Sequence, residues 1–173
     1  MVETQPAFQK LEEVAVVAET TAVIVEPIEE IAVVETTPQP SEYEVLRANA
    51  IAEQERASQE RLERVLDYTK QTMVAYMSEA ELDRLCGYIT EYSLGDTLCE
   101  VSPVSVDSAL KSIDLMHFGW NIGKAFGKKR IHTATFIKNV FAHALRDIEV
   151  STIERKMSHT ESECRIKLNN KIA

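Results

Sequence analysis

The chain has 173 residues, of which 45% are hydrophobic, and a formal net charge of −9, which together predict one ordinary domain or a small domain with extensions. Five Gly and five Pro are too few for a turn-rich β-sandwich or barrel, and three Cys without a CxxC pair give neither a disulfide framework nor a metal motif. We therefore predict an all-α fold, with at most a minor strand or wing near the C-terminus, in a reducing compartment. Because no secretory signal or membrane-spanning run is visible, the expected location is the cytoplasm, with no membrane partner.

Charge divides the chain into an acidic and a basic part. Residues 1–40 hold one Lys and eight Glu (net −7), residues 41–104 six basic and thirteen acidic residues (net −7), and residues 105–173 twelve basic and seven acidic residues (net +5). The basic part can face a polyanion, or the acidic part of the same chain. This division singles out residues 105–173 as the candidate functional region.

Residues 1–40 read as an acidic, low-complexity tail. Val, Ala, Glu, Thr and Ile dominate, Pro27, Pro38 and Pro40 interrupt any ladder, and no aromatic residue lies between Phe8 and Tyr43. Such a composition cannot build a core, so we predict disorder. The alternative is a segment that adds a strand to the sheet edge of a partner.

Residues 41–78 are predicted to form a long, partly exposed helix. Ser41 and Glu44 have the spacing of a capping box, and neither Gly nor Pro occurs from Ser41 to Cys86. The second half carries an apolar stripe of Leu62, Val65, Leu66, Thr69, Met73 and Tyr76. The stripe covers about two heptads, where a coiled coil needs three or four. We expect this half to dock on the C-terminal domain; self-association through the helix is the alternative.

Residues 79–104 are predicted to be a short helix and a loop. A second capping box, Ser78 to Glu81, opens the helix, and Gly95-Asp96 signals the turn that follows it. One face of this helix is apolar, formed by Leu82, Leu85, Cys86 and Ile89.

Residues 105–173 are predicted to be a basic helical domain. We expect helices from Val106, capped by Ser105, to Phe126; from Thr133 to Asp147; and from Thr152 to His159, the last opened by a third capping box at Ser151 and Glu154. Alternating apolar and basic residues over 164–168 give a weak strand signal. The predicted core of this domain is Trp120, Phe136, Val140, Phe141 and Leu145. Glycines at 119, 123 and 127 indicate close helix packing or fraying toward Gly127.

The run Gly127-Lys128-Lys129-Arg130 is the most basic segment of the chain. Cations at a helix C-terminus are favoured by the dipole, so the run has a structural explanation as well as a functional one, a loop that contacts phosphates. A P-loop is excluded, because the glycines lie too close together for GxxxxGK[ST] and Lys129 stands where Ser or Thr is required.

The helices over Phe136–Leu168 have the order of a helix-turn-helix unit, with Ser151-Thr152-Ile153 opening the second helix and a wing after it. This layout resembles the C-terminal part of the RteC-type regulators of bacterial mobile elements, which implies a DNA-binding regulator. The usual turn Gly is replaced by Asp147-Ile148-Glu149, whose acidic residues would crowd a phosphate backbone. No site residue is carried over from that family.

These patterns predict a nucleic-acid-binding regulator or accessory protein, and the resemblance to the RteC-type regulators implies one of a bacterial mobile element or phage. Its candidate phosphate contacts are Lys128, Lys129, Arg130, Arg155 and Lys156, and Thr152 is expected near the bases. The alternative is a non-catalytic interaction or assembly module that acts through the long helix and the acidic tail. No base and nucleophile converge in a pattern, and the four His supply no ligand spacing, so we predict no enzyme, no cofactor and no metal.

Overall fold

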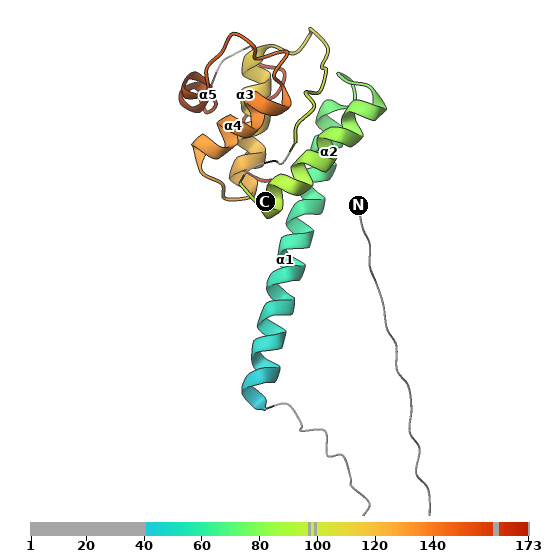
Figure 1. The fold of residues 1–173 in the computed structure, drawn as a ribbon, viewed down its shortest axis with the longest axis vertical. Helices are drawn as coiled ribbons and strands as arrows, with labels where there is room; N and C mark the ends of the chain where they lie inside the picture. Colours follow the sequence, from blue (N-terminus) through green and yellow to red (C-terminus); the bar gives the residue numbers. More distant parts are fainter. Residues whose placement is uncertain (1–40, 97, 99, 161–162, 173) are drawn as a thin grey trace, which may run out of the picture. The chain divides into compact units, whose positions relative to one another are not determined.

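The computed structural model describes residues 41–172 except 97, 99, 161 and 162. Its five helices in this part are α1 (Glu42–Met73), α2 (Glu79–Leu94), α3 (Ser112–Ala125), α4 (Arg130–Val140) and α5 (Val150–Lys156) (Figure 1). The all-α prediction is confirmed for these residues. The predicted strand over 164–168 is wrong, because none of these five residues is in a strand. The predicted disorder of residues 1–40 falls outside the described residues.

The predicted capping box fixes where α1 begins. Glu44 N–H donates to Ser41 Oγ at 3.3 Å, and Ser41 N–H donates to a carboxylate oxygen of Glu44 at 2.8 Å. Residues 42–61 are all exposed, whereas Val65, Thr69 and Met73 are buried. The second half of α1 therefore docks on the other helices, as predicted, and the first half extends away from them (Figure 1).

Of the two hydrogen bonds of the capping box predicted for α2, only one is confirmed. Ser78 Oγ accepts from Glu81 N–H at 3.4 Å, but the Glu81 carboxylate accepts from Ser105 N–H at 3.2 Å and pairs with Arg84. The hydrogen bond from Arg84 is the main reason that the pKa of Glu81 lies below its usual range. Glu81 thus ties α2 to the loop that follows it.

Helix α3 begins at Ser112, and the predicted start at Val106 is wrong. A turn closed by Leu110 N–H on Asp107 O occupies that stretch. Asp114 accepts from Lys111 N–H at 2.9 Å and so satisfies the first orphan amide at the new start. Most residues of the helix are buried; Lys124 is exposed, and Trp120 is half-buried and packs against the core cluster, so it is less buried than the other predicted core residues. The other four predicted core residues are buried: Phe136, Val140, Phe141 and Leu145.

The glycine spacing in α3 allows α4 to approach closely, as predicted. A Cβ atom at Gly119 would lie 1.8 Å from Ile137 Cδ1, and one at Gly123 would lie 2.2 Å from Thr133 Oγ1. Gly127 ends the helix with φ of 67°, a conformation that favours glycine. Lys128 N–H then returns to Gly123 O at 2.8 Å.

The last two helices begin earlier than predicted. Helix α4 starts at Arg130 and gives way after Val140 to turns over 141–147, where Lys138 Nζ donates to Leu145 O and Arg146 O at 2.6 and 2.9 Å. Helix α5 has Glu149 as its N-cap, without a side-chain cap hydrogen bond. The predicted third capping box is therefore wrong, because Ser151 already lies inside the helix.

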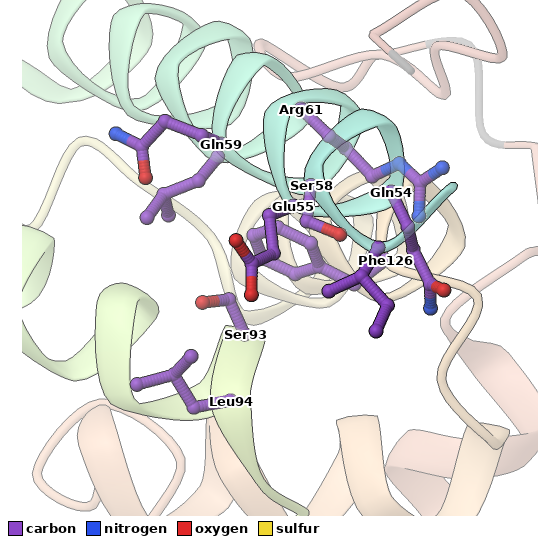
Figure 2. Close-up of a pocket in the computed structure, with 10 residues that line it drawn as sticks. Gln54, Glu55, Ser58, Gln59, Arg61, Ser93, Leu94 and Phe126 are labelled. Atoms are coloured by element: carbon purple, nitrogen blue, oxygen red, sulfur yellow. The ribbon is translucent and has the colours of Figure 1, made fainter. Parts of the chain in front are cut away.

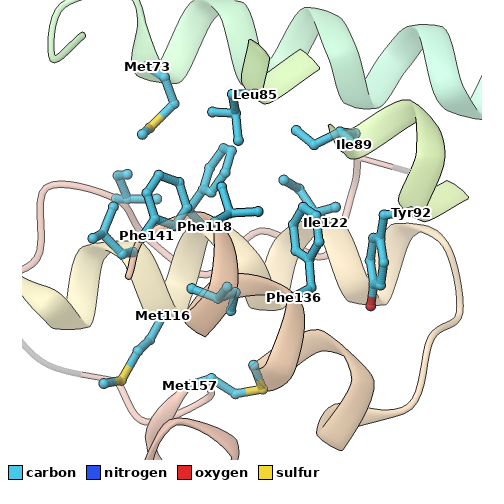
Figure 3. Packing of buried hydrophobic residues seen from close by; sticks show 14 of the residues in the cluster. Met73, Leu85, Ile89, Tyr92, Met116, Phe118, Ile122, Phe136, Phe141 and Met157 are labelled. Carbon is cyan, nitrogen blue, oxygen red and sulfur yellow. The ribbon is translucent and has the colours of Figure 1, made fainter. Parts of the chain in front are cut away.

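One hydrophobic cluster joins all five helices, so residues 105–173 share their core with α1 and α2 (Figure 3). Tyr92 of α2 stacks on Phe136 of α4 with centroids 4.3 Å apart. Phe118 of α3 meets the ring of Phe141 edge-on at 6.1 Å. These ring pairs connect helices that are distant in the sequence.

Tyr92 makes folding sensitive to alkaline pH. Its side chain is fully buried, its hydroxyl lies 2.9 Å from Thr133 Oγ1, and burial raises its pKa from 10.0 to about 12. The pKa of Tyr92 is higher in the folded state than in the unfolded state. The contribution of its neutral hydroxyl to the free energy of unfolding is therefore complete below pH 10 and is lost as pH rises through about 12. We expect a loss of roughly 2–3 kcal/mol across this window, at about 1.4 kcal/mol per pKa unit. Urea unfolding at several alkaline pH values measures it. Tyr92→Phe should lack this component, and an equally steep decline in that variant would contradict the assignment.

Candidate nucleic-acid interface

A cavity lined by cations opens where α3 ends and α4 begins. It measures about 330 Å³, and its lining residues are Trp120, Gly123, Lys124, Gly127, Lys128, Arg130 and Thr133. Three of these residues are cationic and none is acidic. We call it the cationic cavity; two of the predicted phosphate contacts, Lys128 and Arg130, line it.

Lys128 also ties the α3–α4 connection to the end of α2. Its Nζ donates to Gly95 O at 2.9 Å and to Asp96 Oδ1 at 3.1 Å, and it lies 5.4 Å from the centroid of the Tyr92 ring. The hydrogen bond from Lys128 is the main reason that the pKa of Asp96 is lowered. The Lys128 side chain is only 15% exposed, so its position is fixed before any ligand arrives.

Arg130 ties the start of α4 to the end of α5. Its guanidinium donates to Ser158 Oγ at 3.0 Å and to Glu154 O, and it lies 5.0 Å from the centroid of the Trp120 ring. Arg130 and Trp120 thus form a cation–π pair at the edge of the cavity. Arg130 has a structural role that its place in a basic run did not predict.

The other predicted contacts are freer. Lys129, Arg155 and Lys156 are exposed, whereas Thr152 is half-buried. Arg155 and Lys156 belong to the last turn of α5, and Lys129 precedes the first residue of α4. The fold therefore holds Lys128 and Arg130 in the cavity wall and leaves these three cations in solvent.

The amino end of α4 adds to the positive character of the cavity. No side chain caps this helix, which leaves its first amides without a side-chain acceptor. Arg130 and Thr133, both in its first turn, belong to the cavity wall. The positive end of the helix dipole thus acts in the same place as the three cations.

Sequence reasoning missed Lys124 and Trp120 as members of this site. Lys124 is exposed and its Nζ donates to Asn170 Oδ1 at 2.6 Å. The signal was present as the spacing of four between Trp120 and Lys124, which places these two side chains along one face of α3, whereas Lys128 lies beyond Gly127, after the helix has ended.

The connection between α4 and α5 is longer than in a helix-turn-helix unit. It spans residues 141–149, whereas the motif joins its helices through three or four residues. Helix α5 has only seven residues, with Glu149 at its amino end and Arg155 and Lys156 at its carboxyl end. Arg155 and Lys156 therefore lie at the carboxyl end of α5, whereas the motif reads bases with the first residues of its second helix.

A row of buried polar side chains on α3 holds the C-terminal segment, residues 163–172. Asp114 Oδ1 accepts from Arg165 N–H and Ile166 N–H at 2.6 and 3.0 Å, and Asn121 Oδ1 accepts from Asn169 N–H at 2.7 Å. Asn121 Nδ2 also donates to Lys167 O at 2.9 Å. The alternation of apolar and basic residues over 164–168, which predicted a strand, thus belongs to a segment that is hydrogen-bonded to side chains of α3. In this segment Arg165 and Lys167 are exposed.

His117, in the same row, connects this segment to the residues after α5. Its two ring nitrogens lie 2.8 Å from Ile166 O and 2.7 Å from His159 O. The ring can donate to both carbonyls only as the imidazolium, because a neutral imidazole carries a single N–H. His117 therefore holds two basic stretches of the surface in one arrangement.

Comparison of the chain with protein-family models, with curated proteins and with solved structures found no match. Among the described residues, no group of three His, Cys, Asp or Glu is placed to hold a metal ion. In the same part of the chain, no helix combines the length and the apolar character that a membrane span requires.

Proposed function

We propose that this protein binds nucleic acid and that the cationic cavity takes a backbone phosphate. The observation that carries the proposal is the wall of this cavity, with three cations, no carboxylate and the amino end of α4. Phosphate contacts supply most of the affinity of proteins for nucleic acid, and helix amino ends are common phosphate sites. The expected ligand class is DNA of a bacterial mobile element or phage, on which the protein acts as a regulator or accessory factor.

Two kinds of residue have distinct roles in this proposal. Lys124, Lys128 and Arg130 contact one phosphate in the cavity, and the Arg130–Trp120 pair offers a flat surface on which an unpaired base can stack. The exposed cations Lys129, Arg155 and Lys156 contact neighbouring phosphates. Thr152, beside Ile153 in α5, is the residue expected to discriminate between bases.

The test is a fluorescence-anisotropy titration of the full chain on duplex DNA at several salt concentrations. Affinity should fall by about 0.9 log units per phosphate contact for each tenfold rise in salt. The variant Lys129→Ala/Lys156→Ala should flatten this slope by up to about two contacts. The side chains of Lys129 and Lys156 are both exposed and make none of the hydrogen bonds described above. Their removal should therefore leave the fold unaffected.

A matched control carries the same change in charge. Arg47→Ala/Lys70→Ala removes two exposed cations from α1, far along the chain from the cavity, and should keep the parental slope. Thr152→Ala should leave the slope unchanged and reduce discrimination between sequences. Absence of binding at low salt, or equal slopes for the two double variants, would refute the proposal.

A further inference from the structure

Trp120 is the only tryptophan of the chain, and it lies in the wall of the cationic cavity. Its ring is half-buried, and the guanidinium of Arg130 lies 5.0 Å from the ring centroid. In a duplex, the faces of each base are covered by the neighbouring base pairs, so an aromatic side chain finds no base to stack on. A strand with unpaired bases can stack them on aromatic rings and on arginine planes. The Trp120–Arg130 pair therefore favours an unpaired base over a base pair.

Two cations of the wall keep their charge available for a phosphate. Lys124 Nζ donates to the side-chain oxygen of Asn170, and the guanidinium of Arg130 donates to a hydroxyl and to a main-chain carbonyl. These acceptors are neutral, so they cancel neither charge. Lys128, by contrast, is paired with Asp96 at 3.1 Å. A phosphate in the cavity would thus be bound mainly by Lys124 and Arg130, next to the Trp120 ring.

The cavity also has the size of a site for one nucleotide. It measures about 330 Å³, near the lower limit of about 300 Å³ for small-ligand sites in proteins. This space admits one base and its phosphate but not both strands of a duplex. A larger groove, of about 550 Å³, lies beside α1 and the end of α2 (Figure 2). Its charged side chains are Glu55 and Arg61, whose charges cancel, so this groove lacks the positive charge that a phosphate requires.

Two basic stretches adjoin the wall of the cationic cavity. The hydrogen bond from Lys124 to Asn170 connects the wall to the C-terminal segment, and those from Arg130 connect it to the end of α5. The exposed cations of these stretches are Lys167 and Lys171 in the C-terminal segment, and Arg155 and Lys156 in α5. A strand with one nucleotide in the cavity can therefore bring its next phosphates to further cations, which a free nucleotide cannot do.

We propose that the nucleic acid bound at the cationic cavity is single-stranded, with one unpaired base stacked on Trp120 and the adjoining phosphate bound by Lys124 and Arg130. This inference rests on the proposed binding of nucleic acid and names the form of nucleic acid that the cavity takes. Duplex DNA still binds through its phosphates, but more weakly, because it cannot place a base on Trp120.

The full chain is titrated at low salt with an oligothymidylate of about 16 nucleotides, the upper end of site sizes for single-strand binders, and with a duplex of the same length. We expect the single strand to bind roughly tenfold more tightly, within the range that base–aromatic stacking supplies. The emission of Trp120 should fall when the single strand binds and stay constant when the duplex binds. Because the chain has no other tryptophan, this signal reports on the cavity alone. An oligouridylate of the same length tests RNA, and the tighter of the two strands identifies the kind of nucleic acid.

Variants of Trp120 test the stacking by anisotropy of a labelled strand. Trp120→Leu should lose roughly tenfold in affinity for the oligothymidylate and none for the duplex, whereas Trp120→Phe should keep most of the preference. The matched control is Tyr76→Leu, which changes another half-buried aromatic residue, outside the cationic cavity, and should keep the parental preference. Urea unfolding checks that each variant is folded; if Trp120→Leu is not, the emission change of the parent chain still decides.

The outcomes separate this inference from the proposed function. A duplex that binds as tightly as the single strand overturns the inference and leaves the proposed function standing. Binding of the single strand without a change in Trp120 emission does the same, because the base then lies elsewhere. A chain that binds neither form at low salt refutes the proposed function, and the inference with it.

Discussion

Phe141→Ala is expected to lower the free energy of unfolding by about 3–5 kcal/mol, the range for truncating a buried aromatic side chain. Phe141 is fully buried, follows the last residue of α4, and meets Phe118 of α3 edge-on. Its loss would open a cavity between the two helices that form the walls of the candidate site. Since a small domain has only about 5–15 kcal/mol of stability, the variant should be barely folded at room temperature.

Urea unfolding followed by circular dichroism measures this change. The matched control is Phe126→Ala, which removes the same side chain from a half-buried position and should cost less. A midpoint for Phe141→Ala close to that of the parent would mean that the surrounding side chains can fill the space.

Features set by short stretches of sequence were predictable. The start of α1 depends on two side chains three residues apart, Ser41 and Glu44, and the structure reproduces both hydrogen bonds. The burial of Phe136, Val140 and Phe141 follows from their spacing along one helix. The approach of α3 to α4 could be anticipated from Gly119 and Gly123, because only glycine permits such contact.

Features set by distant residues were not predictable in this way. Ser105 is a good cap by composition, but its N–H is taken by Glu81, and the helix begins after Lys111, where Asp114 caps it. Trp120 continues an apolar stripe, yet it is only half-buried, and the guanidinium of Arg130 from the next helix lies over its ring. In both cases a tertiary contact overrides a local signal.

The candidate site was predictable in charge but not in arrangement. The basic run identified Lys128 and Arg130, both of which line the cavity. Their fixed positions depend on two main-chain carbonyls, those of Gly95 and Glu154, which periodicity cannot place near them. The C-terminal segment was misread for the same reason: its alternation is real, but its partners are side chains of α3 and not another strand.

Asp114→Ala is expected to release the C-terminal segment. The carboxylate is fully buried and accepts three main-chain N–H groups, from Lys111 at 2.9 Å, Arg165 at 2.6 Å and Ile166 at 3.0 Å. Alanine leaves all three donors without this acceptor, and hydrogen bonds to a charged group are worth about 1.5–3 kcal/mol each. Because the freed segment can regain hydrogen bonds to water, we expect a net loss of about 3–5 kcal/mol, less than the sum of the three bonds.

Amide hydrogen exchange distinguishes a local release from a global loss of stability. In Asp114→Ala, the amides of Arg165, Ile166 and Asn169 should exchange faster than those of α4, because the segment opens without unfolding the core. The control is Lys124→Ala, on the same helix and facing the same segment, which removes only an exposed bond to Asn170 and should leave these amides protected. Equal acceleration across α4 and the segment would show that Asp114 supports the whole fold.

Release of the C-terminal segment should also weaken binding to DNA, because the segment carries the exposed cations Arg165 and Lys167 and is joined through His117 to the residues after α5. If the segment opens and affinity for DNA stays constant, these two cations lie outside the interface.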